Sequence, residues 1–137
     1  MGRVIVEVDL ANHEDVILSD AGMLLPEKVR RTTFTGVIDT GATRLVLPQQ
    51  VVKDLGLRVS GETVVRYADQ RAAKRKVAPY VQLRLLGRES VFSAVVEPRR
   101  KDALIGAIVL EELDLIVDCN RQRLMPRDPE RIISEIE

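Results

Sequence analysis

The chain has 137 residues, which is enough for one domain that buries a core without disulfides or metal. Its 21 basic and 21 acidic residues balance, so no global charge favours nucleic acid or an anionic membrane surface as a partner. No apolar run approaches the length that crosses a bilayer, and the first residues lack the apolar centre of a secretion signal. The single cysteine, Cys119, cannot form an internal disulfide and is compatible with a reducing cytoplasm, so we expect a cytoplasmic protein.

The first half of the chain is predicted to hold three strands, one long loop and one helix. Alternating apolar and polar residues at 4–9 predict a half-buried strand. Residues 11–31 contain many polar residues together with a glycine and a proline, and we expect them to form a long loop. Strands are predicted at 32–38 and 45–47. A helix is predicted at 48–56, which has proline in its first turn and glycine at its end.

The second half is predicted to consist mainly of hairpins. We expect strands at 63–67, 77–86, 91–96, 113–117 and 122–125, with a turn at 68–71. The strand at 113–117 is almost continuously apolar, which predicts burial on both of its faces. One or two helical turns are predicted at 107–112. A C-terminal helix is predicted at 128–137, with Asp128 as its cap.

Together these elements predict an all-β fold with one or two short helices. Many short strands joined by tight turns are typical of a closed or nearly closed barrel. Neither an internal repeat nor a low-complexity segment marks a domain boundary. We therefore expect a single domain over residues 1–137, with its core at about 32–125.

The segment Asp39-Thr40-Gly41-Ala42 carries the clearest sign of chemistry. It lies between two apolar stretches, so an acidic residue is delivered from the end of a strand directly into a glycine turn. We expect this tight loop to be buried and to hold the carboxylate in a fixed position. Asp and Gly together also mark ordinary turns, so the alternative is that Asp39 only caps its own loop.

Residues 37–43 (VIDTGAT) resemble the active-site loop of the retropepsin-like aspartic proteases. Residues 103–106 (ALIG), which precede the predicted helical turns, are similar to the signature of two hydrophobic residues and a glycine in that family. The hairpin with its tip at 67–71 falls between them, where this family carries its flap. The resemblance is closest to small bacterial single-domain members, and it implies a closed barrel of the acid-protease type.

The resemblance implies that Asp39 is catalytic and that the protein is an aspartic endopeptidase without a metal or cofactor. Hydrolysis of a peptide bond then needs a base to activate water and an acid to protonate the amide. Two carboxyls about 3 Å apart cannot both ionise, and a pair that shares one proton supplies both groups. The chain has one such loop, so the second carboxyl must be Asp39 of an identical chain in a homodimer.

The resemblance also implies roles for the neighbours of Asp39. The Thr40 hydroxyl is expected to bond across the dimer, and the Gly41 amide to approach the carboxylate. Ala42 is expected to be small because two loops crowd together, and Ile105 to line the substrate cleft. The expected contacts of a peptide or protein substrate on the flap are Tyr67, Ala68, Asp69 and Gln70.

Two features leave a second function open. Related bacterial chains tend to have glycine where Gln70 stands, and the loop at 11–31 is long. If either feature blocked the cleft, the chain would be a non-catalytic peptide-binding or dimerisation module that keeps the barrel.

Four other features have simpler interpretations. Tyr67 fits a half-exposed strand aromatic as well as a flap residue, and Asp69 fits a turn residue. His13 is expected in the long loop and has no partner at metal-ligand spacing. A solvated face that protects a strand edge is the simplest interpretation of the basic cluster, although it could also attract acidic peptides or phosphates. This cluster consists of Arg71, Lys74, Arg75 and Lys76.

Overall fold

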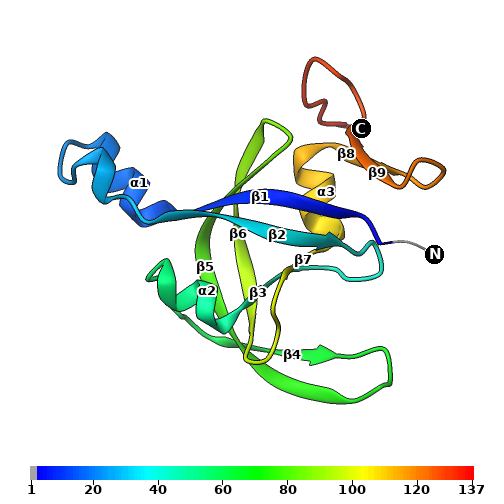
Figure 1. The fold of residues 1–137 in the computed structure, drawn as a ribbon, viewed down its shortest axis with the longest axis horizontal. Coiled ribbons are helices and arrows are strands. Elements are labelled where there is room, and N and C mark those ends of the chain that lie inside the picture. The colour runs from blue at the N-terminus through cyan, green and yellow to red at the C-terminus, as the bar shows by residue number, and fades with distance from the viewer. Residues whose placement is uncertain (1–2) are drawn as a thin grey trace.

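Six strands close into a barrel in the computed structural model, which describes residues 3–137 (Figure 1). The paired strands follow the order β1, β2, β7, β3, β6, β5, and β5 pairs back with β1 to complete the ring. These strands are β1 (Ile5–Asn12), β2 (Arg31–Ile38), β3 (Leu45–Pro48), β5 (Ala72–Leu85), β6 (Arg88–Glu97) and β7 (Ala103–Ile105). The prediction of a closed β-barrel is confirmed.

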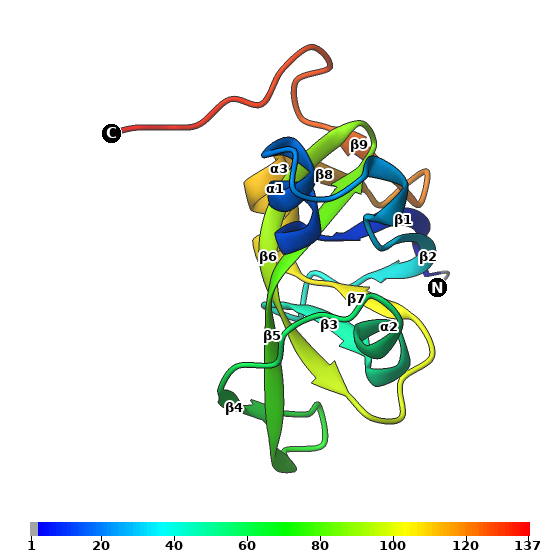
Figure 2. The same ribbon diagram turned by 90° about the vertical axis from the view of Figure 1, so that its left-hand side faces the viewer.

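Three strands lie outside this ring. β4 (Glu62–Arg66) pairs only with β5, and the two form a hairpin arm that projects from the barrel (Figures 1 and 2). β8 (Leu115–Asp118) and β9 (Arg123–Pro126) form a separate two-stranded sheet. The predicted burial of the 113–117 strand on both faces is wrong, because β8 pairs only with β9 and Ile116 is 43% exposed.

The core of the barrel is aliphatic. Val8 and Leu10 of β1 are buried, whereas Glu7 and Asp9, which alternate with them, are exposed, and this confirms the predicted half-buried strand. Other fully buried side chains come from every side of the ring and from α3, and they include Leu47, Leu83, Ile105 and Leu113. Burying one such side chain stabilises the fold by about 2 kcal/mol, so repeated aliphatic contacts hold the barrel together.

Residues 11–31 form a helix and a helical turn, so the prediction of a long loop is wrong. α1 (His13–Asp20) begins directly after β1, and the 3₁₀ turn η1 (Pro26–Lys28) precedes β2. Asn12 caps α1, because its side-chain oxygen accepts the Asp15 N–H at 3.1 Å. The Asp15 carboxylate accepts the Nε–H of Arg30 at 2.8 Å, and this bond lowers the pKa of Asp15. The two ends of the excursion are thereby fastened together.

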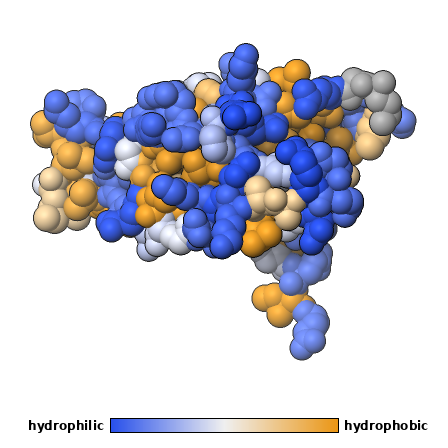
Figure 3. All heavy atoms as spheres, turned by 90° about the horizontal axis from the view of Figure 1, so that it is seen from below, coloured by the Kyte–Doolittle hydropathy of each residue, from blue (hydrophilic) through white to orange (hydrophobic). Residues whose placement is uncertain are grey.

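The sequence of α1 lacks the apolar periodicity by which a helix is recognised, which is why the helix was not predicted. At this end of the molecule the apolar side chains of Ile17, Leu18, Met23 and Leu25 are exposed. Figure 3 shows apolar surface at this end, on the left of the molecule. His13, which we expected in a loop, is the first residue of α1, and its Nδ1 lies 2.8 Å from Oε1 of Gln82 on β5.

Two of the three predicted helices form, those at 48–56 and 107–112. α2 (Gln49–Asp54) begins after Pro48 and is followed by Gly56, whose φ of +59° suits the end of a helix. Its buried face carries Val51 and Val52. α3 (Ala107–Leu113) follows β7 across one glycine. No helix in the described chain is long and apolar enough to cross a membrane.

The predicted C-terminal helix at 128–137 does not form. The three isoleucines that would make its apolar face, Ile132, Ile133 and Ile136, are exposed. Asp114, just after α3, binds this segment in another conformation, because its Oδ2 accepts the Ile133 N–H at 3.0 Å. Its Oδ1 accepts the Arg127 Nε–H at 2.6 Å. A backbone amide that is bound to a distant side chain is not free to donate within a helix.

Candidate active site

The end of β2 delivers Asp39 to an exposed loop beside β7. The Asp39 N–H donates to the Ile105 carbonyl at 3.0 Å. Asp39 Oδ1 accepts the Gly41 N–H at 2.9 Å, and the Asp39 carbonyl accepts the Ala42 N–H at 3.1 Å. These bonds fix the loop, but Asp39 and Thr40 are exposed. The prediction of a buried loop is therefore wrong for a single chain.

Gly41 lies close to the Asp39 carboxylate, where a side chain would be crowded. A Cβ at this position would lie 3.2 Å from Asp39 Oδ1, tighter than most side-chain contacts, while the φ of Gly41 is not positive. The predicted approach of the Gly41 amide to the carboxylate is confirmed. Within residues 3–137 the Thr40 hydroxyl has no hydrogen-bond partner, so its bond across a dimer stays a prediction.

Gly106 and the first turn of α3 hold the acidic loop from the other side. The Ala107 N–H donates to the Ala42 carbonyl at 2.8 Å, and the Ile108 N–H donates to the Thr43 carbonyl at 2.9 Å. A Cβ on Gly106 would lie 2.4 Å from the Arg44 carbonyl oxygen and 2.8 Å from that of Ala42. Only glycine fits between helix and loop, so the position of the loop depends on residue 106.

Ile105 does not line a cleft, contrary to prediction. Its side chain is fully buried and packs against Gly36 of β2, where a Cβ would lie 3.1 Å from the Ile105 Cγ1. Leu104, one residue earlier, points to the opposite side of β7 and lines the pocket between the acidic loop and the hairpin arm. The alternation along β7 therefore assigns Ile105 to the core and Leu104 to the pocket.

The hairpin between β4 and β5 has a tight turn at its tip. The Gln70 N–H donates to the Tyr67 carbonyl at 2.9 Å, and the Tyr67 N–H donates to the Arg71 carbonyl at 2.8 Å. Gln70 has a φ of +73°, so it adopts the left-handed conformation that glycine favours. Asp69 Oδ1 accepts the Arg71 N–H at 3.0 Å, which confirms Asp69 as a turn residue.

Tyr67 ties this hairpin to the end of β6. Its hydroxyl donates to Glu97 Oε2 at 2.6 Å, and the Arg75 Nε–H donates to Glu97 Oε1 at 2.6 Å. Burial, and then the hydrogen bond to Glu97, raises the pKa of the Tyr67 hydroxyl. The guanidinium of Arg71 lies over the Tyr67 ring, 5.2 Å from its centroid. The Tyr67 hydroxyl therefore fastens the hairpin arm to Glu97, while its ring packs against Arg71 of the same hairpin.

A cavity of about 480 Å³ separates the acidic loop from the hairpin. One wall is the loop from Gly41 to Arg44, and the other is the strand from Val64 to Tyr67. Val46, Val95, Glu97, Arg100 and Leu104 complete the lining. Of the predicted flap contacts only Tyr67 lines this cavity, while Ala68, Asp69 and Gln70 are exposed at the tip.

Sequence reasoning missed three residues that shape this cavity. Glu97 and Arg100 come from the end of β6 and the loop after it, and Leu104 comes from β7. Their positions follow from the pairing of strands in the barrel. No local pattern marks Glu97 or Arg100, whereas Leu104 belongs to the segment ALIG, whose resemblance to the family signature did not show which side chain faces the cavity. Within residues 3–137 no group of histidine, cysteine and acidic side chains is placed to hold a metal ion.

A family model of aspartyl proteases matches residues 26–109, more than half of the chain. The chain belongs to the aspartyl protease family. The matched residues include the acidic loop, the hairpin arm of β4 and β5, and Gly106. No curated protein matches the chain in sequence.

Proposed function

We propose that this aspartyl protease is an endopeptidase that acts as a homodimer, with Asp39 of each chain forming one catalytic pair. The observation that carries the proposal is the exposed carboxylate of Asp39 on a loop that the rest of the chain holds firmly. The carboxylate is fixed at the surface, and residues Gly41 to Arg44 of the same loop form one wall of the cavity. This arrangement suits half of an active site that a second chain completes.

The single chain supports this proposal because, within residues 3–137, the cavity lining contains no second acid that is free to take part in the reaction. Glu97 is the only carboxyl that lines the cavity within the described residues. Both of its oxygens already accept hydrogen bonds, from Tyr67 and from Arg75. The partner of Asp39 is then the same residue of a second chain.

The proposed reaction divides acid and base between the two Asp39 side chains. The ionised carboxylate takes a proton from a water molecule as the water oxygen attacks the peptide carbonyl carbon. The protonated carboxyl donates its proton to the carbonyl oxygen. The C–N bond then breaks with proton transfer to the leaving nitrogen, and the pair again holds one proton between two carboxyls.

The neighbours of Asp39 are suited to a contact between two loops. Thr40 is exposed, and its hydroxyl is available to a second chain. Ala42 is small and half-buried beside α3, so two copies of the loop can approach closely. We assign Thr40 to fastening the loops together and Ala42 to leaving room for them.

The features that would favour a non-catalytic module lie away from the cavity. α1 and η1 adjoin the start of β2, whereas Asp39 follows its end, so the excursion is at the far side of the barrel (Figure 1). Gln70 adopts the conformation that glycine would take and does not line the cavity. A peptidase function is therefore the better supported of the two.

Dilution tests the proposed function. If the dimer is the active species, the specific rate of cleavage of labelled, unfolded casein falls as the chain is diluted below the dissociation constant of the dimer. Sedimentation velocity at the same concentrations is expected to show dimer converting to monomer over the same range. A chain that sediments as a monomer and keeps a constant specific activity would contradict the proposal.

A further inference from the structure

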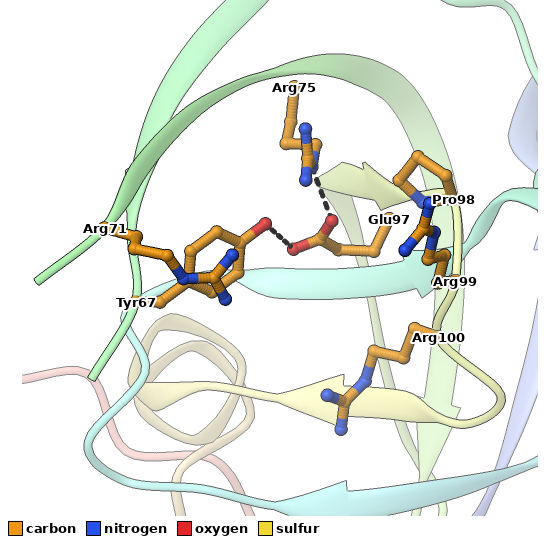
Figure 4. A pocket seen from close by; sticks show the side chains of 7 residues that line it. All are labelled: Tyr67, Arg71, Arg75, Glu97, Pro98, Arg99 and Arg100. Carbon is orange, nitrogen blue, oxygen red and sulfur yellow. Dashed lines mark hydrogen bonds and ion pairs between the residues drawn. The ribbon is translucent and has the colours of Figure 1, made fainter. Parts of the chain in front are cut away.

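A second pocket lies beside the cavity of the proposed active site and is rich in arginine. Its volume is about 560 Å³. Four of its seven lining residues are arginines: Arg71, Arg75, Arg99 and Arg100. In Figure 4, Arg71 and Tyr67 stand on one side of this arginine pocket, Arg99 and Arg100 stand on the other, and Arg75 and Glu97 lie between them.

The acids near the pocket leave many of the guanidinium donors unused. Arg71 binds Asp69 through its Nε, and Arg75 binds Glu97 through its Nε. Each guanidinium carries five N–H donors, so the terminal nitrogens of Arg71 remain available. Within residues 3–137 no carboxylate lies within ion-pair distance of Arg99.

Arg100 has the most restricted environment among these arginines. Its Nε–H donates to the Asp102 carbonyl at 2.9 Å, and its Nη2 lies 2.9 Å from Asp102 Oδ1. Its side chain is 26% exposed, and that of Arg75 is 28% exposed. Both guanidinium groups are held in place by ion pairs, Arg75 by Glu97 within the pocket and Arg100 by Asp102. A charge that is partly shielded from water binds an anion more strongly than a fully solvated one.

The arginine pocket adjoins the cavity between the acidic loop and the hairpin arm. Tyr67, Glu97 and Arg100 line both of them. A peptide that lies along the cavity therefore passes the mouth of the arginine pocket, and one of its side chains can enter it.

We propose that the arginine pocket is a subsite for an acidic side chain, aspartate or glutamate, of the peptide substrate. Guanidinium groups bind carboxylates through paired N–H···O bonds, and here several of them face one space. The inference rests on the proposed function only in that the bound carboxylate belongs to a substrate peptide. It predicts that the protein prefers substrates with an acidic residue at a fixed distance from the cleaved bond.

Binding to a non-cleaving chain tests the subsite independently of catalysis. The host is the Asp39→Asn variant, and the probes are two fluorescein-labelled peptides of equal length that differ in carrying an oligo-glutamate or an oligo-glutamine segment. We expect the glutamate peptide to bind about tenfold more tightly at low salt, as measured by fluorescence anisotropy. Adding Arg99→Gln or Arg100→Gln to the host is expected to remove most of this preference.

Arg31→Gln in the same host is the matched control. Arg31 is exposed at the start of β2, remote from the loop that follows the end of that strand, and its loss changes the net charge equally. The preference for glutamate is expected to survive this change. Equal binding of the two peptides, or an equal loss of preference in the control, would overturn the subsite.

Two other outcomes separate related explanations. Much tighter binding of a matched oligo-phosphoserine peptide than of the glutamate peptide would overturn the assignment to carboxylates. Because the host cannot cleave, a missing preference would leave the role of Asp39 intact. A clear preference in a protein whose wild-type form cleaves nothing would support the subsite and contradict the proposed peptidase function.

Discussion

Replacing Asp39 by asparagine is expected to lower kcat/KM for peptide cleavage by about 10³-fold or more, to the limit of detection. The amide neither takes a proton from water nor donates one at the strength of a carboxylic acid, so the catalytic pair loses both of its functions. The exposed position of residue 39 means that the change removes no core contact. The folded state and the dimer are therefore expected to persist, as measured by circular dichroism and sedimentation.

Asp54→Asn is the matched control for this substitution. Asp54 is also exposed, but it lies at the end of α2 and contacts Gln50 in the same helix. The same chemical change at this position is expected to leave cleavage within about twofold of the wild type, because surface substitutions away from special features have small effects. Cleavage retained in a pure preparation of Asp39→Asn would refute the assignment of the catalytic residue.

Gly106→Ala is expected to destabilise the fold by about 3 kcal/mol and to lower activity with it. The added Cβ would lie 2.4 Å from the Arg44 carbonyl oxygen, and this neighbour is backbone that cannot rotate away. Relief of the clash requires α3 or the acidic loop to move, which breaks the bonds from Ala107 and Ile108 to the loop. Urea unfolding followed by circular dichroism measures the change in stability.

Gly87→Ala serves as the comparison for Gly106→Ala. A Cβ on Gly87 would meet nothing within 4 Å, and its φ of +77° makes the left-handed backbone the main cost, about 1 kcal/mol. Gly106 has a φ of −86°, so it carries no such backbone cost, and a larger loss of stability in Gly106→Ala comes from the clash. If both variants lost the same stability, the tight fit of Gly106 against the loop would be wrong.

The sequence predicted those parts of the molecule that local patterns determine. The acidic turn, the helix that follows Pro48 and the hairpin of β4 and β5 each have turn residues or periodicity of their own, and the structure has all three. The barrel followed because many short strands with tight turns have few ways to bury their apolar faces. The contact between the Gly41 amide and Asp39 could also be predicted, since it lies within three residues.

The parts that tertiary contacts determine could not be predicted in this way. α1 depends on its cap at Asn12 and on the bond between Asp15 and Arg30, with little apolar periodicity to mark it. The C-terminal segment has helical periodicity but is bound by Asp114 through the amide of Ile133. In both segments a hydrogen bond from a polar side chain, Asn12 in one and Asp114 in the other, fixes a backbone conformation that the apolar pattern did not predict.

The basic cluster shows the same limit at the level of single side chains. Lys74 and Lys76 are exposed, as expected of a solvated face. Arg75 lies on the other face of β5, half-buried, and pairs with Glu97 on the adjacent strand β6. Strand alternation predicts that Arg75 and its neighbours Lys74 and Lys76 face opposite sides of β5. That Arg75 pairs with Glu97 of β6 is known only once the strands are paired.

Mixing wild-type chains with Asp39→Asn chains tests the central claim most directly, because the account requires one carboxyl from each of two chains. After the two are unfolded together and refolded at a fixed amount of wild type, random pairing predicts that an equal amount of the variant halves the total rate of cleavage. A threefold excess is expected to leave about one quarter of it, since dimers with one asparagine are inactive. A rate that stays unchanged at every ratio, although sedimentation shows mixed dimers, would contradict a catalytic pair shared between chains.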